Sequence, residues 1–160
     1  MQIRNHLKFL LIMCFMLLSF TKNSYSQIQL NDSTRVMTVI QKMFEGMRLG
    51  NKKLFISAFD SSAVLMSIGN SLGKTNIHTD DYMSFAQAVG TPHPQVWDER
   101  ITNPVIHISG DLASVWAEYS FYLGDKLNHC GIDSFQLVKR DDGWKILVIV
   151  DTRRKEGCEK

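Results

Sequence analysis

The sequence predicts an α+β domain in which helices come first along the chain and a mainly antiparallel sheet follows. In residues 32–49 the apolar side chains recur every three or four positions, which is the period of a helix with one buried stripe. After Pro94, long segments alternate between apolar and polar residues and are joined by short turns. Short connections of this kind make neighbouring strands antiparallel.

The helical half is predicted to contain three helices and one strand. Asn31 or Asp32 can cap the first helix, and Gly50 can end it in the left-handed conformation. A short helix over residues 52–59, a strand over residues 63–69 and a third helix over residues 79–89, capped by Thr79, are expected next.

Four strands are predicted over residues 96–108, 112–123, 129–140 and 144–152. Pro104 falls inside the first of them. Because proline has no amide hydrogen to donate, we expect Pro104 at a bulge or at an unpaired edge position.

The first 26 residues have the layout of a secretory signal peptide. Arg4 and Lys8 precede an apolar run over residues 9–18, and small residues at Ser24 and Ser26 fit a cleavage site before Gln27. Cys14 lies within the apolar run and is assigned to the signal. The run is shorter than the roughly 20 residues that a membrane helix needs. We therefore expect a protein of residues 27–160 that is periplasmic or secreted, with no membrane association after cleavage.

The charge balance argues against a nucleic-acid partner. The first 26 residues hold three of the 18 basic residues and none of the 16 acidic ones, so the remaining chain is close to neutral. The scattered histidines show no metal-ligand spacing, so we expect no metal and no cofactor.

Cys130 and Cys158 remain after processing, and an exported protein meets an oxidising compartment in which this pair can form a disulfide. Such a bond would stabilise the fold by roughly 3 kcal/mol and pin the C-terminal tail to the sheet. The alternative is a metal-binding or catalytic thiol, but Cys130 has only His129 beside it and lacks the repeated spacing of a zinc site.

The chain resembles the nuclear transport factor 2-like and SnoaL-like superfamily in its order of elements and in the closing run Gly143-Trp144-Lys145-Ile146. Within that superfamily it is similar to the family labelled "putative lumazine-binding". The similarity lies in His129-Cys130-Gly131, Phe135-Gln136-Leu137, Asp151-Thr152-Arg153-Arg154 and Gly157-Cys158.

This resemblance implies a cone-shaped, cystatin-like roll over residues 27–160, with helices packed in a curved sheet around an interior pocket. It also implies a homodimer through the outer sheet face, where Trp116 is predicted to lie. Steroid-isomerase-like members carry a catalytic carboxylate where this chain has Met66-Ser67-Ile68, so that base is missing and Ser67 is interpreted as an ordinary strand serine.

The side chains that face the interior depend on one turn. If Asp142-Gly143 is a two-residue turn, the inner face carries Tyr119, Phe121, His129, Asp133, Phe135, Leu137, Trp144, Ile146 and Val148. A shift of one residue would bring Asp151 onto that face instead, so the faces of Asp151 and Arg153 stay open.

Three functional hypotheses follow. The first is a binding domain for a small organic ligand held between Trp97, Tyr119, Phe121, His129 and Phe135. The second is a lyase or isomerase with His129 as general base, Tyr119 as proton donor and Asp133 or Glu118 in support. The third is a non-catalytic dimeric interaction module. Ordinary core hydrogen bonding by His129, Tyr119 and Asp133 remains the alternative to any catalytic role.

Overall fold

The computed structural model describes residues 32–158, and the compact unit that contains the sheet begins at Arg35. The expected signal peptide and the cap at Asn31 lie outside the described residues. The first helix runs over residues 32–48. Gly50, two residues after the last helical residue, takes a φ of +62° and stops the helix, as predicted. The next helix, α2 (Lys52–Ile56), is capped by the Asn51 side chain, which accepts a hydrogen bond from the Leu54 amide at 3.1 Å.

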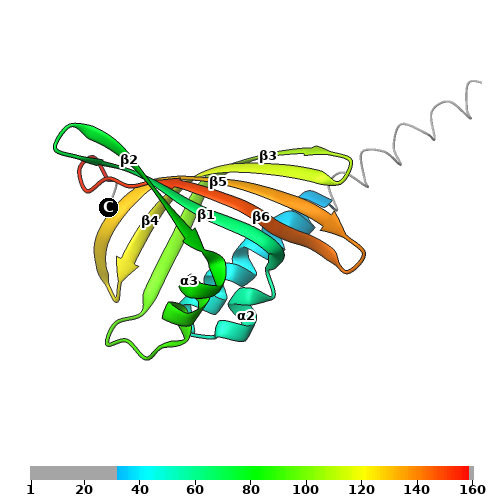
Figure 1. The fold of residues 1–160 in the computed structure, drawn as a ribbon, viewed down its shortest axis with the longest axis horizontal. Coiled ribbons are helices and arrows are strands. Elements are labelled where there is room, and N and C mark those ends of the chain that lie inside the picture. Colours follow the sequence, from blue (N-terminus) through cyan, green and yellow to red (C-terminus); the bar gives the residue numbers. More distant parts are fainter. Residues whose placement is uncertain (1–31, 159–160) are drawn as a thin grey trace, which may run out of the picture. The chain divides into compact units, whose positions relative to one another are not determined.

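Six strands form one curved sheet with the helices on one of its faces (Figure 1). The order across the sheet is β2-β1-β6-β5-β4-β3, and every neighbouring pair is antiparallel except β1 with β6. The bounds are β1 (Phe59–Ser71), β2 (Lys74–Asp81), β3 (Trp97–Ser109), β4 (Leu112–Leu123), β5 (Lys126–Arg140) and β6 (Gly143–Thr152). The predicted α+β architecture is confirmed.

One strand, β2, was not predicted, and the third helix was predicted to begin too early. Residues 79–81 belong to β2, and α3 (Tyr82–Gly90) is capped by Asp81, whose side chain accepts from the Ser84 amide, rather than by Thr79. β2 shows no alternation of buried residues, because it is exposed along nearly its whole length. Pairing with β1 across the tight turn at Leu72-Gly73 forms this strand, which local periodicity cannot reveal.

Pro104 lies at a bulge of an edge strand, as predicted. The register between β3 and β4 shifts between Thr102 and Val105, and β3 is the last strand of the sheet. Asn103 takes a φ of 49° at the bulge.

A second bulge, at Leu147, decides which side chains of β6 lie on the inner face. The turn before β6 consists of Asp141-Asp142 rather than Asp142-Gly143, because Arg140 pairs with Gly143. Trp144 and Ile146 are buried on the inner face, as predicted. The register then shifts by one residue at Leu147, so Val148 leaves the inner face, contrary to the prediction. Asp151 therefore lies directly opposite Asp133.

The core lies between the first helix, α2, α3 and the inner face of the sheet. Phe135 is fully buried and meets Phe44 of the first helix edge to face, with ring centroids 6.2 Å apart. Within residues 32–158 no helix is long and apolar enough to span a membrane.

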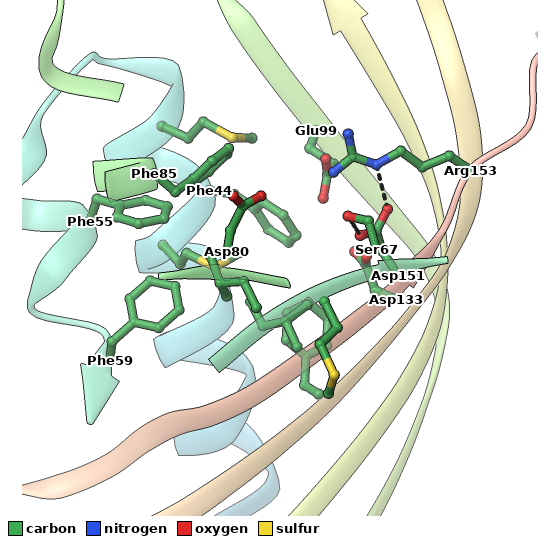
Figure 2. A pocket seen from close by; sticks show the side chains of 16 residues that line it. Phe44, Phe55, Phe59, Ser67, Asp80, Phe85, Glu99, Asp133, Asp151 and Arg153 are labelled. Carbon is green, nitrogen blue, oxygen red and sulfur yellow. Dashed lines mark hydrogen bonds and ion pairs between the residues drawn. The ribbon is translucent and has the colours of Figure 1, made fainter. Parts of the chain in front are cut away.

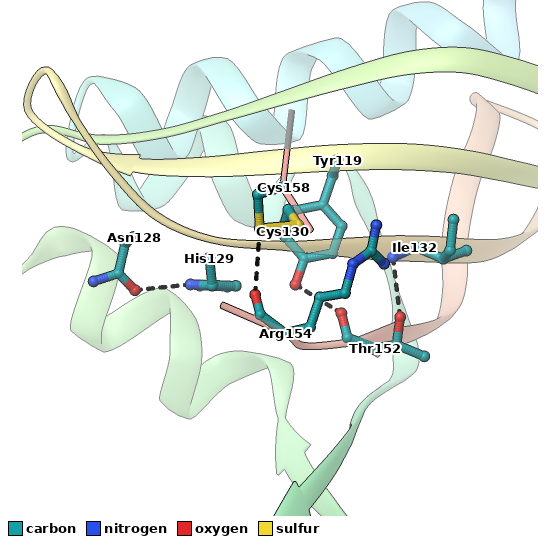
Figure 3. Close-up of a disulfide and its surroundings, with 8 residues drawn as sticks. All are labelled: Tyr119, Asn128, His129, Cys130, Ile132, Thr152, Arg154 and Cys158. Atoms are coloured by element: carbon teal, nitrogen blue, oxygen red, sulfur yellow. Dashed lines mark hydrogen bonds between the residues drawn. A yellow bond between two sulfur atoms is a disulfide. The ribbon is translucent and has the colours of Figure 1, made fainter. Parts of the chain in front are cut away.

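The Cys130–Cys158 disulfide is formed, with the two Cα atoms 5.7 Å apart (Figure 3). The backbone of Cys130 exchanges two hydrogen bonds with Arg154, at 3.0 and 2.9 Å. The C-terminal tail is thus held against β5 by a covalent bond and by an added bridge of the sheet.

Candidate functional site

A cavity of about 80 Å³ lies between the helices and the inner face of the sheet (Figure 2). Its walls have two characters. The apolar part is formed mainly by Met43, Phe44, Met47, Phe55, Phe59, Phe85, Phe135 and Ile149. The polar part is formed by Ser67, Asp80, Glu99, Asp133, Asp151 and Arg153.

The sheet assembles the polar part from neighbouring strands. Ser67 on β1, Asp151 on β6 and Asp133 on β5 are register partners, so they stand side by side across three strands. Partners on adjacent strands are about 5 Å apart. Glu99 joins them from edge strand β3. It lies on the inner face of that strand, two residues from Trp97 on one side and two residues from Ile101 on the other.

Asp151 is well supplied with hydrogen-bond donors. It forms an ion pair with Arg153, whose Nε lies 2.7 Å from Oδ2, and it accepts a short hydrogen bond from the Ser67 hydroxyl. The Tyr119 hydroxyl lies 3.3 Å from the same carboxylate and donates its closer hydrogen bond, at 2.9 Å, to the Thr152 carbonyl oxygen.

Asp133 has the opposite surroundings. It is only 2% exposed, and its Oδ2 atom has no hydrogen-bond donor among the described residues. Its carboxyl group lies within hydrogen-bonding reach of the Glu99 carboxyl. Because two ionised carboxylates only accept, the contact becomes a hydrogen bond only when one of the two groups carries a proton.

Electrostatics favour that proton. Burial is the main cause that raises the pKa of Glu99 to about 7, with a further contribution from the charge of Asp151. Burial, followed by the charges of Glu99 and Asp151, raises the pKa of Asp133 well above its ordinary value. The two carboxyls therefore hold a shared proton at neutral pH. Burial and nearby Asp151 also raise the pKa of Tyr119.

Some of the site residues predicted from the sequence line the cavity, and others lie outside it. Asp133 and Phe135 line the cavity. Tyr119 is buried beside the polar part and contacts Asp151. Trp97 packs on the rings of Phe85 and His93, with centroids 6.2 and 4.5 Å away, behind the cavity wall.

His129 lies on the inner face, as predicted, with Phe121 as its register partner, but it does not line this cavity. Its ring contacts Phe121 and Tyr119, at centroid distances of 4.9 and 5.7 Å, and its Nδ1 lies 2.8 Å from the Asn128 side-chain oxygen (Figure 3). It borders a separate surface cleft with Asn70 and the segment 153–156. Burial, and then the charge of Arg153, lowers the pKa of His129.

Five of the six polar residues that line the cavity were not selected from the sequence: Ser67, Asp80, Glu99, Asp151 and Arg153, and the sequence alone assigns no face to the last two. Glu99 had a readable signal, since it is a charged residue between two apolar inward positions of a strand. Ser67 gave no such signal, and the inward position of Asp151 depends on the bulge at Leu147. Within residues 32–158, no group of three or more metal-ligating side chains has an arrangement that could hold a metal ion.

The model of the family described as "putative lumazine-binding" matches residues 31–150. The chain belongs to this family. No functionally curated protein matches the chain.

Solved structures show the same fold at low sequence identity. An NTF2-like protein with a cystatin-like fold from Novosphingobium aromaticivorans has a TM-score of 0.69 and 10% identity, over 86% of this chain and 91% of that one. A "putative dehydratase from the NTF2-like family" from Streptomyces avermitilis has a TM-score of 0.61 and 14% identity, over 78% and 97% of the two chains. A cystatin-like protein from Nostoc punctiforme has a TM-score of 0.61 and 12% identity, over 78% and 92%. The fold is therefore the NTF2-like, cystatin-like fold.

Proposed function

We propose that this protein is an exported small-molecule-binding domain whose ligand occupies the cavity between the helices and the sheet. The observation that carries the proposal is the two-sided cavity. Its aromatic walls offer apolar contact, and at its polar side a buried carboxylate oxygen of Asp133 lacks a donor within the described chain. Apolar pockets with a few convergent polar groups are the common form of small-molecule sites.

The family and the fold support the coarser statement that this is a small-molecule-binding domain. The family description points to a flat heteroaromatic ligand, which suits the phenylalanine rings of the cavity. Ligand pockets usually measure about 300–1,000 Å³, so a bicyclic ligand requires the walls to move. Met43 and Met47 provide side chains flexible enough for that movement.

Export and dimerisation complete the proposal. The N-terminal segment has the layout of a signal peptide, which motivates a periplasmic or secreted location. The outer sheet face carries exposed Val105, Leu112 and Trp116, the last of them 55% exposed, and this apolar surface motivates a homodimer.

Native mass spectrometry of the protein, purified from an oxidising compartment without refolding, tests the proposal. We expect a retained small mass that is released on denaturation. Glu99→Gln should reduce its occupancy, whereas Glu118→Gln, a matched change on the exposed outer face, should not. A bare protein that also fails to take up heteroaromatic ligands contradicts the binding function.

A second candidate function is acid–base catalysis, and the pKa of Glu99 near 7 inside a cavity favours it. In this case Glu99 and Asp133 would transfer protons, rather than His129, which faces a different cleft. Turnover of the identified ligand would then be lost in Glu99→Gln and kept in His129→Ala. Loss in His129→Ala with folding intact would restore the histidine as the base.

A further inference from the structure

The cavity collects more negative than positive charge. Asp80, Glu99, Asp133 and Asp151 reach it from four different strands (Figure 2). Among the cavity-lining residues of the described chain Arg153 is the one cation, and it already pairs with Asp151 at 2.7 Å. Asp80 has an exposed partner, His78, at 3.0 Å on the same strand. Glu99 and Asp133 are left facing each other.

The Glu99–Asp133 pair lacks a hydrogen-bond donor at one of its oxygens within the described chain. Asp133 is 2% exposed and its Oδ2 atom is without a partner in residues 32–158. A buried acceptor without a hydrogen bond costs about 1–3 kcal/mol, and more when it is charged. In the empty cavity the shared proton of the carboxyl pair reduces this cost. A ligand that brings its own N–H donor and a positive charge can take the place of that proton.

Aromatic rings line the same cavity. Phe44 and Phe85 lie near Asp80, across the cavity from Glu99 and Asp133 (Figure 2). Faces of aromatic rings attract cations, and their area suits a flat apolar body.

We infer that the ligand is an organic cation, with a protonated nitrogen of the amidinium or ammonium type between the carboxyls of Glu99 and Asp133, and with its apolar body against Phe44 and Phe85. The inference rests on the proposed binding function and specifies the class of its ligand. An anion would meet several carboxylates. A bare metal ion is disfavoured because no suitable ligand group exists among the described residues.

Binding should then depend on pH. Below about pH 7 the incoming cation must displace the proton of Glu99, and above pH 7 it must still displace the proton that Asp133 retains, so affinity should rise with pH, by about tenfold per pH unit for each proton displaced. The other charged or titratable groups around the pair are Asp80, Asp151, Arg153, Tyr119 and, behind Tyr119, His129. Protonation of His129 at low pH acts in the same direction, because it adds a positive charge.

Acetamidinium, acetamide and acetate test the inference, because they share one shape of four heavy atoms and differ in charge. Binding is measured by NMR titration of the exported, disulfide-bonded protein. We expect acetamidinium to bind at least about tenfold more tightly than acetamide, and acetate to bind most weakly, since a charge-assisted hydrogen bond is stronger than a neutral one. The pair benzamidine and benzamide should show the same preference.

Substitutions test whether the preference for the cation arises at Glu99 and Asp133. Glu99→Gln and Asp133→Asn should reduce the preference for the cation to within about twofold. Asp142→Asn is the matched control, because it removes one carboxylate from an exposed turn, 69% exposed. If the cavity variants do not fold, the charge series and its pH dependence on the unaltered protein still decide the question.

The other outcomes separate the inference from the binding function. Tighter binding of acetamide than acetamidinium overturns the cation inference and leaves the binding function standing. If no probe binds, the retained mass decides: a cationic compound supports the inference, and a neutral or anionic one overturns it. If no probe binds and no mass is retained, the proposed function fails as well.

Discussion

The buried carboxyl pair should make this protein less stable as pH rises from 5 to 8. Glu99 has an ordinary pKa of 4.5 and a pKa of about 7 in the folded chain. Between these values the folded state binds more protons at Glu99 than the unfolded state does, so the contribution of Glu99 to the free energy of unfolding falls with rising pH and levels off above pH 7. The raised pKa of Asp133 acts in the same direction and extends the fall to higher pH. The contribution of Glu99 is present in full below pH 4.5 and is lost through pH 7. The rise in pKa corresponds to about 3 kcal/mol.

Comparison with Glu99→Gln separates the contribution of the carboxyl pair from those of the other groups, and it includes Asp133 because the charge of Glu99 helps to raise the Asp133 pKa. The lowered pKa of His129 acts in the opposite direction, because its contribution is gained as pH rises through about 6.5. Carboxyls with a lowered pKa, such as Asp60 beside Arg140, lose stability only as pH falls below about 4. These groups are common to both proteins, so they largely cancel in the difference.

Urea unfolding at several pH values between 5 and 8, followed by tryptophan fluorescence with the disulfide intact, measures the effect. We expect Glu99→Gln to gain up to about 3 kcal/mol relative to the unaltered protein between pH 5 and pH 8. Glu118→Gln, at an exposed position on the outer face, should show no such change. Parallel pH profiles for Glu99→Gln and the unaltered protein would refute the reasoning that a proton is shared at this site.

Three further predictions concern the frame of the site. Reduction of the Cys130–Cys158 disulfide, or replacement of both cysteines by serine, should lower the free energy of unfolding by about 3 kcal/mol in urea titrations. An unchanged urea midpoint would mean that the disulfide does not form in solution or does not stabilise the fold. Gly131→Ala should lower the free energy of unfolding by about 3 kcal/mol or more, because its Cβ would lie 1.8 Å from the Thr152 carbonyl oxygen. Gly69→Ala is the control: its Cβ would meet only the end of the Asn76 side chain, at 2.9 Å, so the loss in the same titration should be less than about 1 kcal/mol. For the proposed homodimer, Trp116→Arg should give a monomer in light scattering where the unaltered protein is dimeric, and a variant that stays dimeric shows that the outer face is not the interface.

Much of the frame could be predicted from local patterns. The first helix shows the 3.6-residue period, the long strands alternate, and Pro104 indicated a bulge because it lacks an amide hydrogen. Asp133 and Phe135 were placed on the inner face correctly, since side chains two apart on one strand share a face. The Cys130–Cys158 pair was a correct candidate for a disulfide.

Local sequence patterns were enough to specify approximately which residues form the helices and most of the strands, and, away from bulges, which residues of one strand share a side. They were not enough to specify which of those sides meet, which depends on how the strands pair. The bulge at Leu147 turned Asp151 toward Asp133, the curved sheet brought Glu99 to the same cluster, and His129 was left facing another cleft. Alternation along a strand is a local property of the backbone, whereas register, bulges and curvature are set by contacts between strands far apart in the chain.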